Sequence, residues 1–181
     1  MVQTMLSAIY AIWTRLRGHF WASLVFDVVL IATIFYAAHV WQTRELPIDR
    51  PAPATVLPLL GGGAQSAIRA GEAGLVYFFA PWCRVCRASI DNLDGLVVGR
   101  RVAWATVVAL DYADEAEVAA FIERTGVTLP VLLGDAGTAA GWSIRGFPTY
   151  YVIDAEGRIH SRSVGYSTWL GMWFRAWRAG L

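Results

Sequence analysis

In the stretch Val76-Tyr-Phe-Phe-Ala-Pro-Trp-Cys-Arg-Val-Cys86, an apolar run rich in aromatic residues leads directly into two closely spaced cysteines. The continuous apolar run is typical of a buried strand. Pro81 ends that strand, and the residues that follow predict a helix from Val85 to about Val98. Cys83 and Cys86 would then lie on the first turn of this helix, where residues three apart come close enough for a disulfide.

The position of the two cysteines favours thiol–disulfide exchange. Unpaired backbone N–H groups and the dipole of a helix N-terminus stabilise a thiolate relative to a thiol. Arg84, between the two cysteines, adds a positive charge at the same place. The sequence therefore predicts an activated nucleophile, Cys83, with a resolving thiol, Cys86, one turn behind it.

A Cys-x-x-Cys pair is also half of many zinc sites, so a metal is the first alternative. These are the only cysteines in the 181 residues, and the three histidines, His19, His39 and His160, are scattered along the chain. A zinc site would need two further ligands, which the sequence does not offer at a recognisable spacing. We therefore predict neither a metal nor another cofactor. Paired thiolates also suit copper(I), and a copper-binding thiol module stays open as an alternative function.

Two segments resemble the thioredoxin superfamily. The first is Phe79-Ala-Pro-Trp-Cys-Arg-Val-Cys86, which is similar to its active-site segment. The second is Ile144-Arg-Gly-Phe-Pro-Thr-Tyr-Tyr-Val-Ile-Asp154, which resembles the segment that carries the superfamily's cis-proline. Within the superfamily, the chain is similar to the membrane-anchored TlpA-like group, which includes the reductants of cytochrome c maturation and the ScsD-like suppressors of copper sensitivity. The resemblance covers about residues 53–181.

This resemblance implies an α/β, thioredoxin-like fold with a central strand–helix insertion between the cysteines and the cis-proline. It also implies that Pro148, preceded by Phe147, lies against the active site and receives the partner chain. Trp82 and Gly165 would complete an apolar docking rim. The chain departs from the family pattern at three positions: Tyr77 replaces a buried acid, Ser89 replaces a glutamate, and Asp91 replaces a helix-kinking proline.

The N-terminal part of the chain predicts a membrane anchor. From Phe20 to Trp41 the residues are almost all apolar, and as a helix they would span about 33 Å, enough to cross a bilayer. Basic residues precede the span, whereas the charges that follow it cancel, so the N-terminus is expected in the cytoplasm and the C-terminal domain outside. A cleaved signal peptide is the alternative, but the apolar core is longer than such peptides have. Asp27 is the one charged residue inside the span, and its role stays open.

The composition agrees with this division: 56% of the residues are hydrophobic, 16% are charged, and the net charge is +1. The first two values favour a segment in lipid, and the third argues against nucleic acid as a partner. We expect a cytoplasmic segment at 1–18, a transmembrane anchor at 19–41, a Pro/Gly-rich tether at 42–63, and the thioredoxin-like domain at 64–181.

The other predicted elements alternate between strands and helices, which indicates a mainly parallel sheet with helices on both faces. They are a short helix at 64–70, a strand at 102–110, a helix at 115–124 with Asp114 as its N-cap, a strand at 130–133 and a helix at 135–142. At the end of the chain, residues 167–178 predict an amphipathic helix with Trp169, Trp173 and Trp177 at four-residue spacing. Packing on the sheet is expected for it, with contact to a membrane surface as the alternative.

The sequence thus predicts a disulfide oxidoreductase anchored in the bacterial inner membrane with its catalytic domain in the periplasm. Its expected partners are thiols and disulfides of exported proteins, a membrane-embedded thiol electron donor, and the lipid bilayer through residues 20–41. Reduction or shuffling of disulfides is the first hypothesis, and a disulfide-introducing oxidase is the alternative within redox chemistry.

Overall fold

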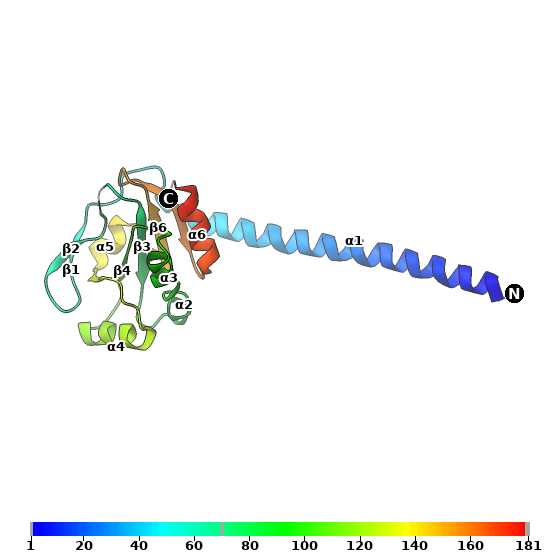
Figure 1. The fold of residues 1–181 in the computed structure, drawn as a ribbon, viewed down its shortest axis with the longest axis horizontal. Coiled ribbons are helices and arrows are strands. Elements are labelled where there is room, and N and C mark those ends of the chain that lie inside the picture. The colour runs from blue at the N-terminus through cyan, green and yellow to red at the C-terminus, as the bar shows by residue number, and fades with distance from the viewer. Residues whose placement is uncertain (1, 70, 180–181) are drawn as a thin grey trace. The chain divides into compact units, whose positions relative to one another are not determined.

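The computed structural model describes residues 2–69 and 71–179, with side chains from residue 21 onward. The chain divides into two compact units, Met1–Gln42 and Thr43–Leu181. The first unit is helical and the second is a sheet with helices on both faces (Figure 1).

The N-terminal unit consists of helix α1, Val2–Thr43. Its segment Trp21–Thr43 is long and apolar enough to cross a membrane. The side chains of this segment are mostly exposed, including Phe26, Phe35 and Trp41. Large apolar side chains exposed along the length of a helix are unusual in water, which agrees with the prediction of a membrane span at 19–41.

The second unit is organised around a five-stranded sheet with the order β5-β4-β3-β6-β7. Its central strand β3 is parallel to β4 and antiparallel to β6, β4 is parallel to β5, and β6 is antiparallel to β7. Every residue of β3, β4 and β6 is buried, which explains their continuous apolar sequences. The strands are β3 Gly74–Phe79, β4 Trp104–Ala109, β5 Val131–Leu133, β6 Thr149–Ile153 and β7 Ile159–Val164.

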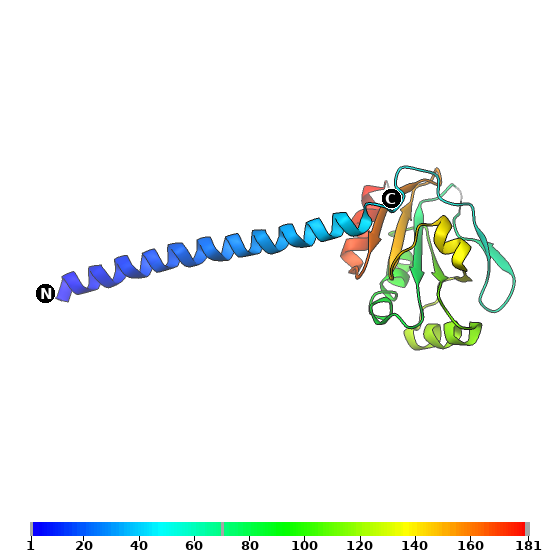
Figure 2. The ribbon, with the colours of Figure 1, turned by 180° about the vertical axis from the view of Figure 1, so that it is seen from behind.

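Helices cover both faces of this sheet. The helices α2 to α4 and α6 contribute to one hydrophobic cluster, whereas Trp142, just after α5, belongs to the cluster on the other face. Figure 2 shows α5, in yellow, on that second face. The side chains of Asp114, Asp135 and Thr168 cap α4, α5 and α6, and the cap at Asp114 is the one that the sequence predicted. The helices are α2 Arg84–Arg87, α3 Asn92–Val98, α4 Glu115–Thr125, α5 Ala136–Gly141 and α6 Trp169–Arg178.

The single helix predicted from Val85 to Val98 is wrong, because α2 and α3 are separate. Between them, two backbone hydrogen bonds reach three residues back instead of the four of an α-helix. Ser89 N–H donates to the Cys86 carbonyl at 3.2 Å, and Leu93 N–H donates to the Ile90 carbonyl at 3.1 Å. The Ser89 hydroxyl also donates to the Val85 carbonyl at 3.1 Å. A serine that bonds the carbonyl four residues back tends to bend a helix, which gives a physical reason for the break.

The predicted tether at 42–63 and the predicted helix at 64–70 also differ from the structure. Strand β1, Val56–Pro58, pairs in an antiparallel hairpin with β2, Ala64–Ser66. The turn between them is Gly61-Gly-Gly63, and all three residues have positive φ, which glycine adopts without steric cost. Leu46, Ala52 and Leu57 are buried in the domain core. These apolar side chains fix the segment to the sheet, so it is part of the domain from its first residues.

Candidate active site

The two cysteines lie where β3 ends and α2 begins. Cys83 is the N-cap residue of α2, and its Sγ accepts a hydrogen bond from the backbone N–H of Cys86 at 3.1 Å. The two residues form a disulfide, with their Cα atoms 5.2 Å apart. Backbone N–H donation and the exposed guanidinium groups of Arg84 and Arg87 all favour negative charge on the Cys83 sulfur once the disulfide is reduced.

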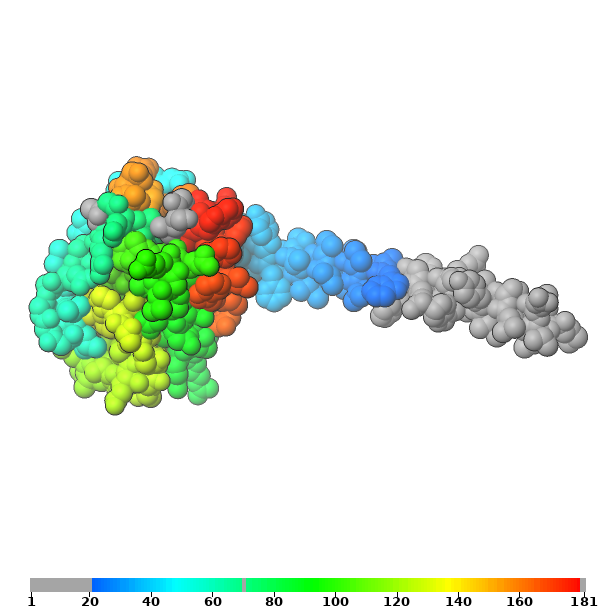
Figure 3. Space-filling model, in the orientation of Figure 1, coloured from blue at the N-terminus to red at the C-terminus, as the bar shows by residue number. Residues whose placement is uncertain are grey.

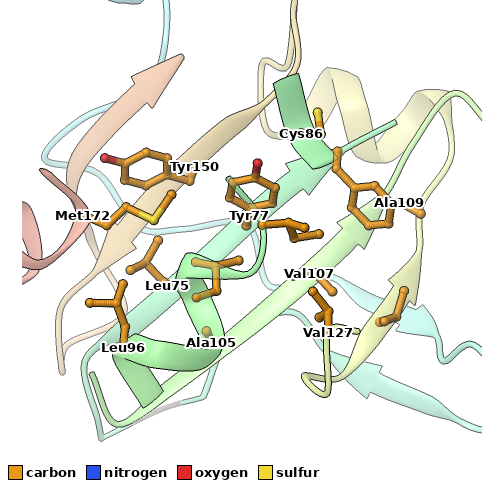
Figure 4. Close-up of a cluster of buried hydrophobic side chains, with 14 of the residues drawn as sticks. Leu75, Tyr77, Cys86, Leu96, Ala105, Val107, Ala109, Val127, Tyr150 and Met172 are labelled. Atoms are coloured by element: carbon orange, nitrogen blue, oxygen red, sulfur yellow. The ribbon is translucent and has the colours of Figure 1, made fainter. Parts of the chain in front are cut away.

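The two cysteines differ in their access to solvent. Cys83 is 5% exposed, whereas Cys86 is fully buried. Figure 4 shows Cys86 at one end of the cluster that also holds Tyr77, Ala109 and Tyr150. A disulfide or thiol of another protein can therefore reach the sulfur of Cys83 but not that of Cys86. This asymmetry is the one that attack by Cys83 and resolution by Cys86 would require.

The ring of Trp82 is exposed next to the cysteine pair and is held in place by Asp111 and Phe147. Its indole N–H donates to a carboxylate oxygen of Asp111 at 3.0 Å and to the Asp111 carbonyl at 3.2 Å. Its ring meets the Phe147 ring edge to face, with centroids 5.8 Å apart. Although the indole N–H is satisfied, 59% of the side chain remains exposed. The apolar part of the ring is therefore presented next to Cys83.

Asp111 was not among the predicted site residues, yet the sequence contained a signal for it. Strands β3 and β4 are parallel, and Phe79 pairs with Ala109 at their carboxyl ends. Residues that follow parallel strands meet at the same edge of a sheet. Once the strand at 102–110 was predicted, its first following residue could have been placed beside the cysteines.

Phe147, Pro148 and Gly165 lie together with Trp82. The Phe147–Pro148 peptide bond is cis. Gly165 N–H donates to the Pro148 carbonyl at 2.8 Å, and Gly165 has φ +87°, which glycine adopts more readily than other residues. The structure thus brings the four residues of the predicted docking rim into one chain of contacts: Trp82 to Phe147 through the rings, and Pro148 to Gly165 through the backbone.

Two of the departures from the family pattern contact each other below the cysteines. The hydroxyl groups of Tyr77 and Ser89 are 2.8 Å apart and hydrogen-bonded, and both residues are fully buried. Burial raises the pKa of Tyr77 far above its ordinary value, so its hydroxyl stays protonated. Asp91, the third departure, is exposed. A neutral hydrogen-bonded pair therefore occupies the place where the resemblance implies an ionisable acid. No pattern in the sequence predicts that these two side chains meet.

We expect Ser89→Ala to destabilise the domain more than Tyr77→Phe. Removing the Ser89 hydroxyl takes the hydrogen-bond partner from the buried Tyr77 hydroxyl, which costs about 1–3 kcal/mol. Removing the Tyr77 hydroxyl leaves Ser89 bonded to the Val85 carbonyl, so the loss should be about 0.5–1.5 kcal/mol. Thermal unfolding of the two variants and of the double variant measures this. Strictly additive losses would show that the two hydroxyls are not coupled.

Among the residues that the structure describes, no three histidine, cysteine, aspartate or glutamate side chains lie close enough together to hold an ion.

Comparisons with known proteins place these features in context. The sequence model of the AhpC/TSA family matches residues 48–162. The thiol:disulfide interchange protein DsbE of Allochromatium vinosum is 31% identical over 147 residues, which cover 76% of this chain and 79% of the relative. The thiol:disulfide interchange protein HelX of Rhodobacter capsulatus is 32% identical over 122 residues, covering 64% of this chain and 67% of the relative.

A similar fold occurs among solved structures. A thiol:disulfide interchange protein of the thioredoxin family from Chlorobium tepidum matches with a TM-score of 0.64 and 24% sequence identity. The match covers 72% of this chain and 95% of that one.

Proposed function

The chain belongs to the AhpC/TSA family of thioredoxin-like proteins and is a thiol–disulfide oxidoreductase, and from this premise we propose that it reduces or shuffles disulfides of exported proteins. The observation that carries the proposal is the difference between the two sulfurs. Cys83 keeps 5% of its surface exposed, accepts a backbone hydrogen bond and follows Trp82 of the apolar rim, whereas Cys86 is fully buried.

The reaction follows from this geometry. In the reduced protein, the Cys83 thiolate attacks one sulfur of a client disulfide, which forms a mixed disulfide and releases one client thiolate. Cys86 then loses its proton and attacks the Cys83 sulfur, which restores the Cys83–Cys86 disulfide and releases the second client thiolate. The protein loses two electrons to the client, and the two released client thiolates take up one proton from Cys86 and one from solvent. A membrane-embedded thiol donor would return the two electrons by the same exchange in reverse.

The rim residues would hold the client during these steps. Trp82 and Phe147 present apolar ring surface, and the backbone at Pro148 lies beside them. An extended client segment laid across this rim would bring its sulfur to Cys83 and exclude water from the exchange. Main-chain pairing of this kind would accept many client sequences.

We place the catalytic domain in the periplasm. Residues 1–18 would lie in the cytoplasm and residues 19–41 would cross the inner membrane. Arg15 and Arg17 precede the span, whereas Arg44, Glu45, Asp49 and Arg50 follow it with no net charge. A basic N-terminal flank favours cytoplasmic retention of that end. An oxidising compartment also gives a reductant client disulfides to act on.

The direct test is to trap clients with Cys86→Ala in membranes. Attack by Cys83 then has no resolving step, so mixed disulfides should accumulate as high-mass bands that disappear on reduction. The matched control carries Cys83→Ala as well and should trap nothing. If the trapped client is a protein whose reacting cysteine normally belongs to a disulfide, this protein is a reductant. Equal trapping by the control, or none by Cys86→Ala, would contradict the proposal.

The redox potential of the Cys83–Cys86 pair distinguishes a reductant from a disulfide-introducing oxidase. Equilibrium with glutathione should give a value near that of thioredoxin, about −270 mV, whereas strong oxidants lie near about −120 mV. A value at the oxidising end would favour the disulfide-introducing alternative for the same two cysteines.

A further inference from the structure

Helix α6 is apolar on two faces, but the domain covers only one of them. Met172 and Ala176 are fully buried against the sheet, with Trp169 and Trp173 packed at the edges of the same core. Arg175 fixes the helix to β6 by donating to the Tyr150 hydroxyl at 2.9 Å. These contacts account for the inner face of α6 and confirm its predicted packing on the sheet.

The outer face carries a second apolar stripe. Leu170, Phe174 and Trp177 recur at helical spacing and are 63%, 50% and 56% exposed. Figure 3 shows α6, in red, at the surface of the domain. Helix α6 is amphipathic, with Arg175 and Arg178 opposite a broad apolar face, and helices of this kind with part of the apolar face uncovered lie in membrane interfaces. Exposed apolar patches on otherwise folded domains mark interaction surfaces.

We propose that the outer face of α6 rests on the surface of the bilayer that holds α1. The inference depends on the membrane anchoring of the proposed function. Chain length supports it: α1 ends at Thr43, and Leu46 is already buried in the domain. Three residues span at most about 11 Å. The domain is therefore held within that distance of the end of the membrane helix.

The path of the chain brings α6 to the same edge of the sheet. The entering segment runs beside the edge strand β7: Asp49 N–H donates to the Ile159 carbonyl at 2.8 Å, and Ile159 N–H donates to the Arg50 carbonyl at 2.8 Å. Strand β7 leads directly into α6 through Gly165 to Thr168. The segment that leaves α1 is thus paired with the edge strand that leads into the helix carrying the stripe.

The chemistry of the stripe fits a lipid interface. Tryptophan and phenylalanine settle at the boundary between headgroups and acyl chains. From Trp169 to Arg178 the helix contains two arginines and no acidic residue, and Arg178 is exposed next to Trp177. Arg175 is bonded to Tyr150 on the inner face, so Arg178 supplies the positive charge beside the stripe. Arginines beside apolar anchors favour anionic headgroups.

A second copy of the chain fits the stripe less well. Stable protein interfaces bury roughly 800 Å² on each partner, whereas three half-exposed side chains supply a few hundred Å² at most. A bilayer needs no complementary shape and is already present beside the domain. Docking through α6 would also hold the rim near the membrane, since Gly165, bonded to Pro148, lies just before the helix. The dithiol would then face a donor embedded in the same membrane.

The test uses the full chain in nanodiscs of phosphatidylethanolamine and phosphatidylglycerol, with Cys83→Ser and Cys86→Ser and one nitroxide label per sample. Labels are placed at Leu170→Cys on the stripe, at Val29→Cys in α1, and at Val56→Cys on β1 as the control. Val56 is 67% exposed, and β1 lies at the opposite end of the domain from α6 in both ribbon views (Figures 1 and 2). Power saturation compares collisions with oxygen, which enters lipid, and with a water-soluble nickel chelate.

We expect the label at 170 to collide preferentially with oxygen, as the label at 29 does, and the label at 56 to remain aqueous. Phe174→Ser with Trp177→Ser should return the label at 170 to water. An aqueous label at 170 with a lipid-exposed label at 29 would overturn the inference and keep the anchor. An aqueous label at 29 would instead overturn the anchoring. Shielding at 170 from both reagents would indicate a protein partner and also overturn the inference.

A second measurement leaves both native cysteines in place. Hydrogen exchange of α6 in the otherwise unmodified chain should be slower in nanodiscs than in the same chain carrying Phe174→Ser and Trp177→Ser. Equal exchange rates would contradict bilayer contact even if the cysteine-free variants folded poorly.

Discussion

Cys83→Ser is expected to reduce thiol–disulfide exchange to the uncatalysed background. Serine has nearly the same shape as cysteine, but its hydroxyl does not ionise near neutral pH and cannot form a disulfide. The fully buried Cys86 cannot take over, because a client sulfur does not reach it. The measurement is the rate at which the reduced full chain reduces a fluorescent disulfide substrate in detergent.

Cys86→Ala is the matched control for that loss. It should keep a single round of attack and form a stable mixed disulfide, while losing repeated turnover. If Cys83→Ser retained turnover, or if Cys86→Ala failed to react even once, the assignment of nucleophile and resolving thiol would be wrong.

Trp142→Ala is expected to destabilise the catalytic domain by about 3–5 kcal/mol. The ring is fully buried and packs against Phe78 and Tyr151, with centroid distances of 5.1 and 5.5 Å. Its indole N–H donates to the Thr55 hydroxyl at 3.2 Å, which ties the N-terminal segment of the domain to the core. Thermal unfolding of the full chain, followed by circular dichroism in detergent, measures the loss.

Trp142→Phe separates packing from the hydrogen bond. It keeps an aromatic ring in the core and removes the contact with Thr55, so its loss should be smaller, about 1–2 kcal/mol. Equal losses for the two variants would show that the hydrogen bond, and not the buried ring, is the main contribution. Wild-type stability in Trp142→Ala would contradict the observed burial.

The elements that the sequence predicted well are those with a continuous physical pattern. The short apolar runs at β3 and β4, rich in β-branched and aromatic residues, favour buried strands, and Asp114 supplies an N-cap before the amphipathic helix α4. The active-site cysteines were recognisable because their spacing and the preceding strand restrict the chemistry. The apolar length of 19–41 was likewise sufficient to predict a helix that can cross a membrane.

The features that escaped prediction depend on contacts between distant parts of the chain. The prolines and glycines at 42–63 suggest a tether by composition, yet Leu46 and Leu57 are buried in the core. That core exists only once the sheet has folded, so the local sequence does not predict their burial. The break after α2 depends on how Ser89 uses its hydroxyl, toward Val85 and Tyr77. Asp111 reaches Trp82 across 29 positions of sequence, through the pairing of two strands.

The ionisation of Cys83 in the reduced chain tests the central claim most directly. The rate of iodoacetamide alkylation is followed from pH 4 to pH 10, with mass spectrometry to identify the modified cysteine. Because the Cys86 N–H and nearby arginines stabilise the thiolate, Cys83 should react first, with an apparent pKa below the value of about 8.5 for free cysteine. Alkylation of both cysteines at one rate, with the pH dependence of a free thiol, would contradict an activated nucleophile at this site.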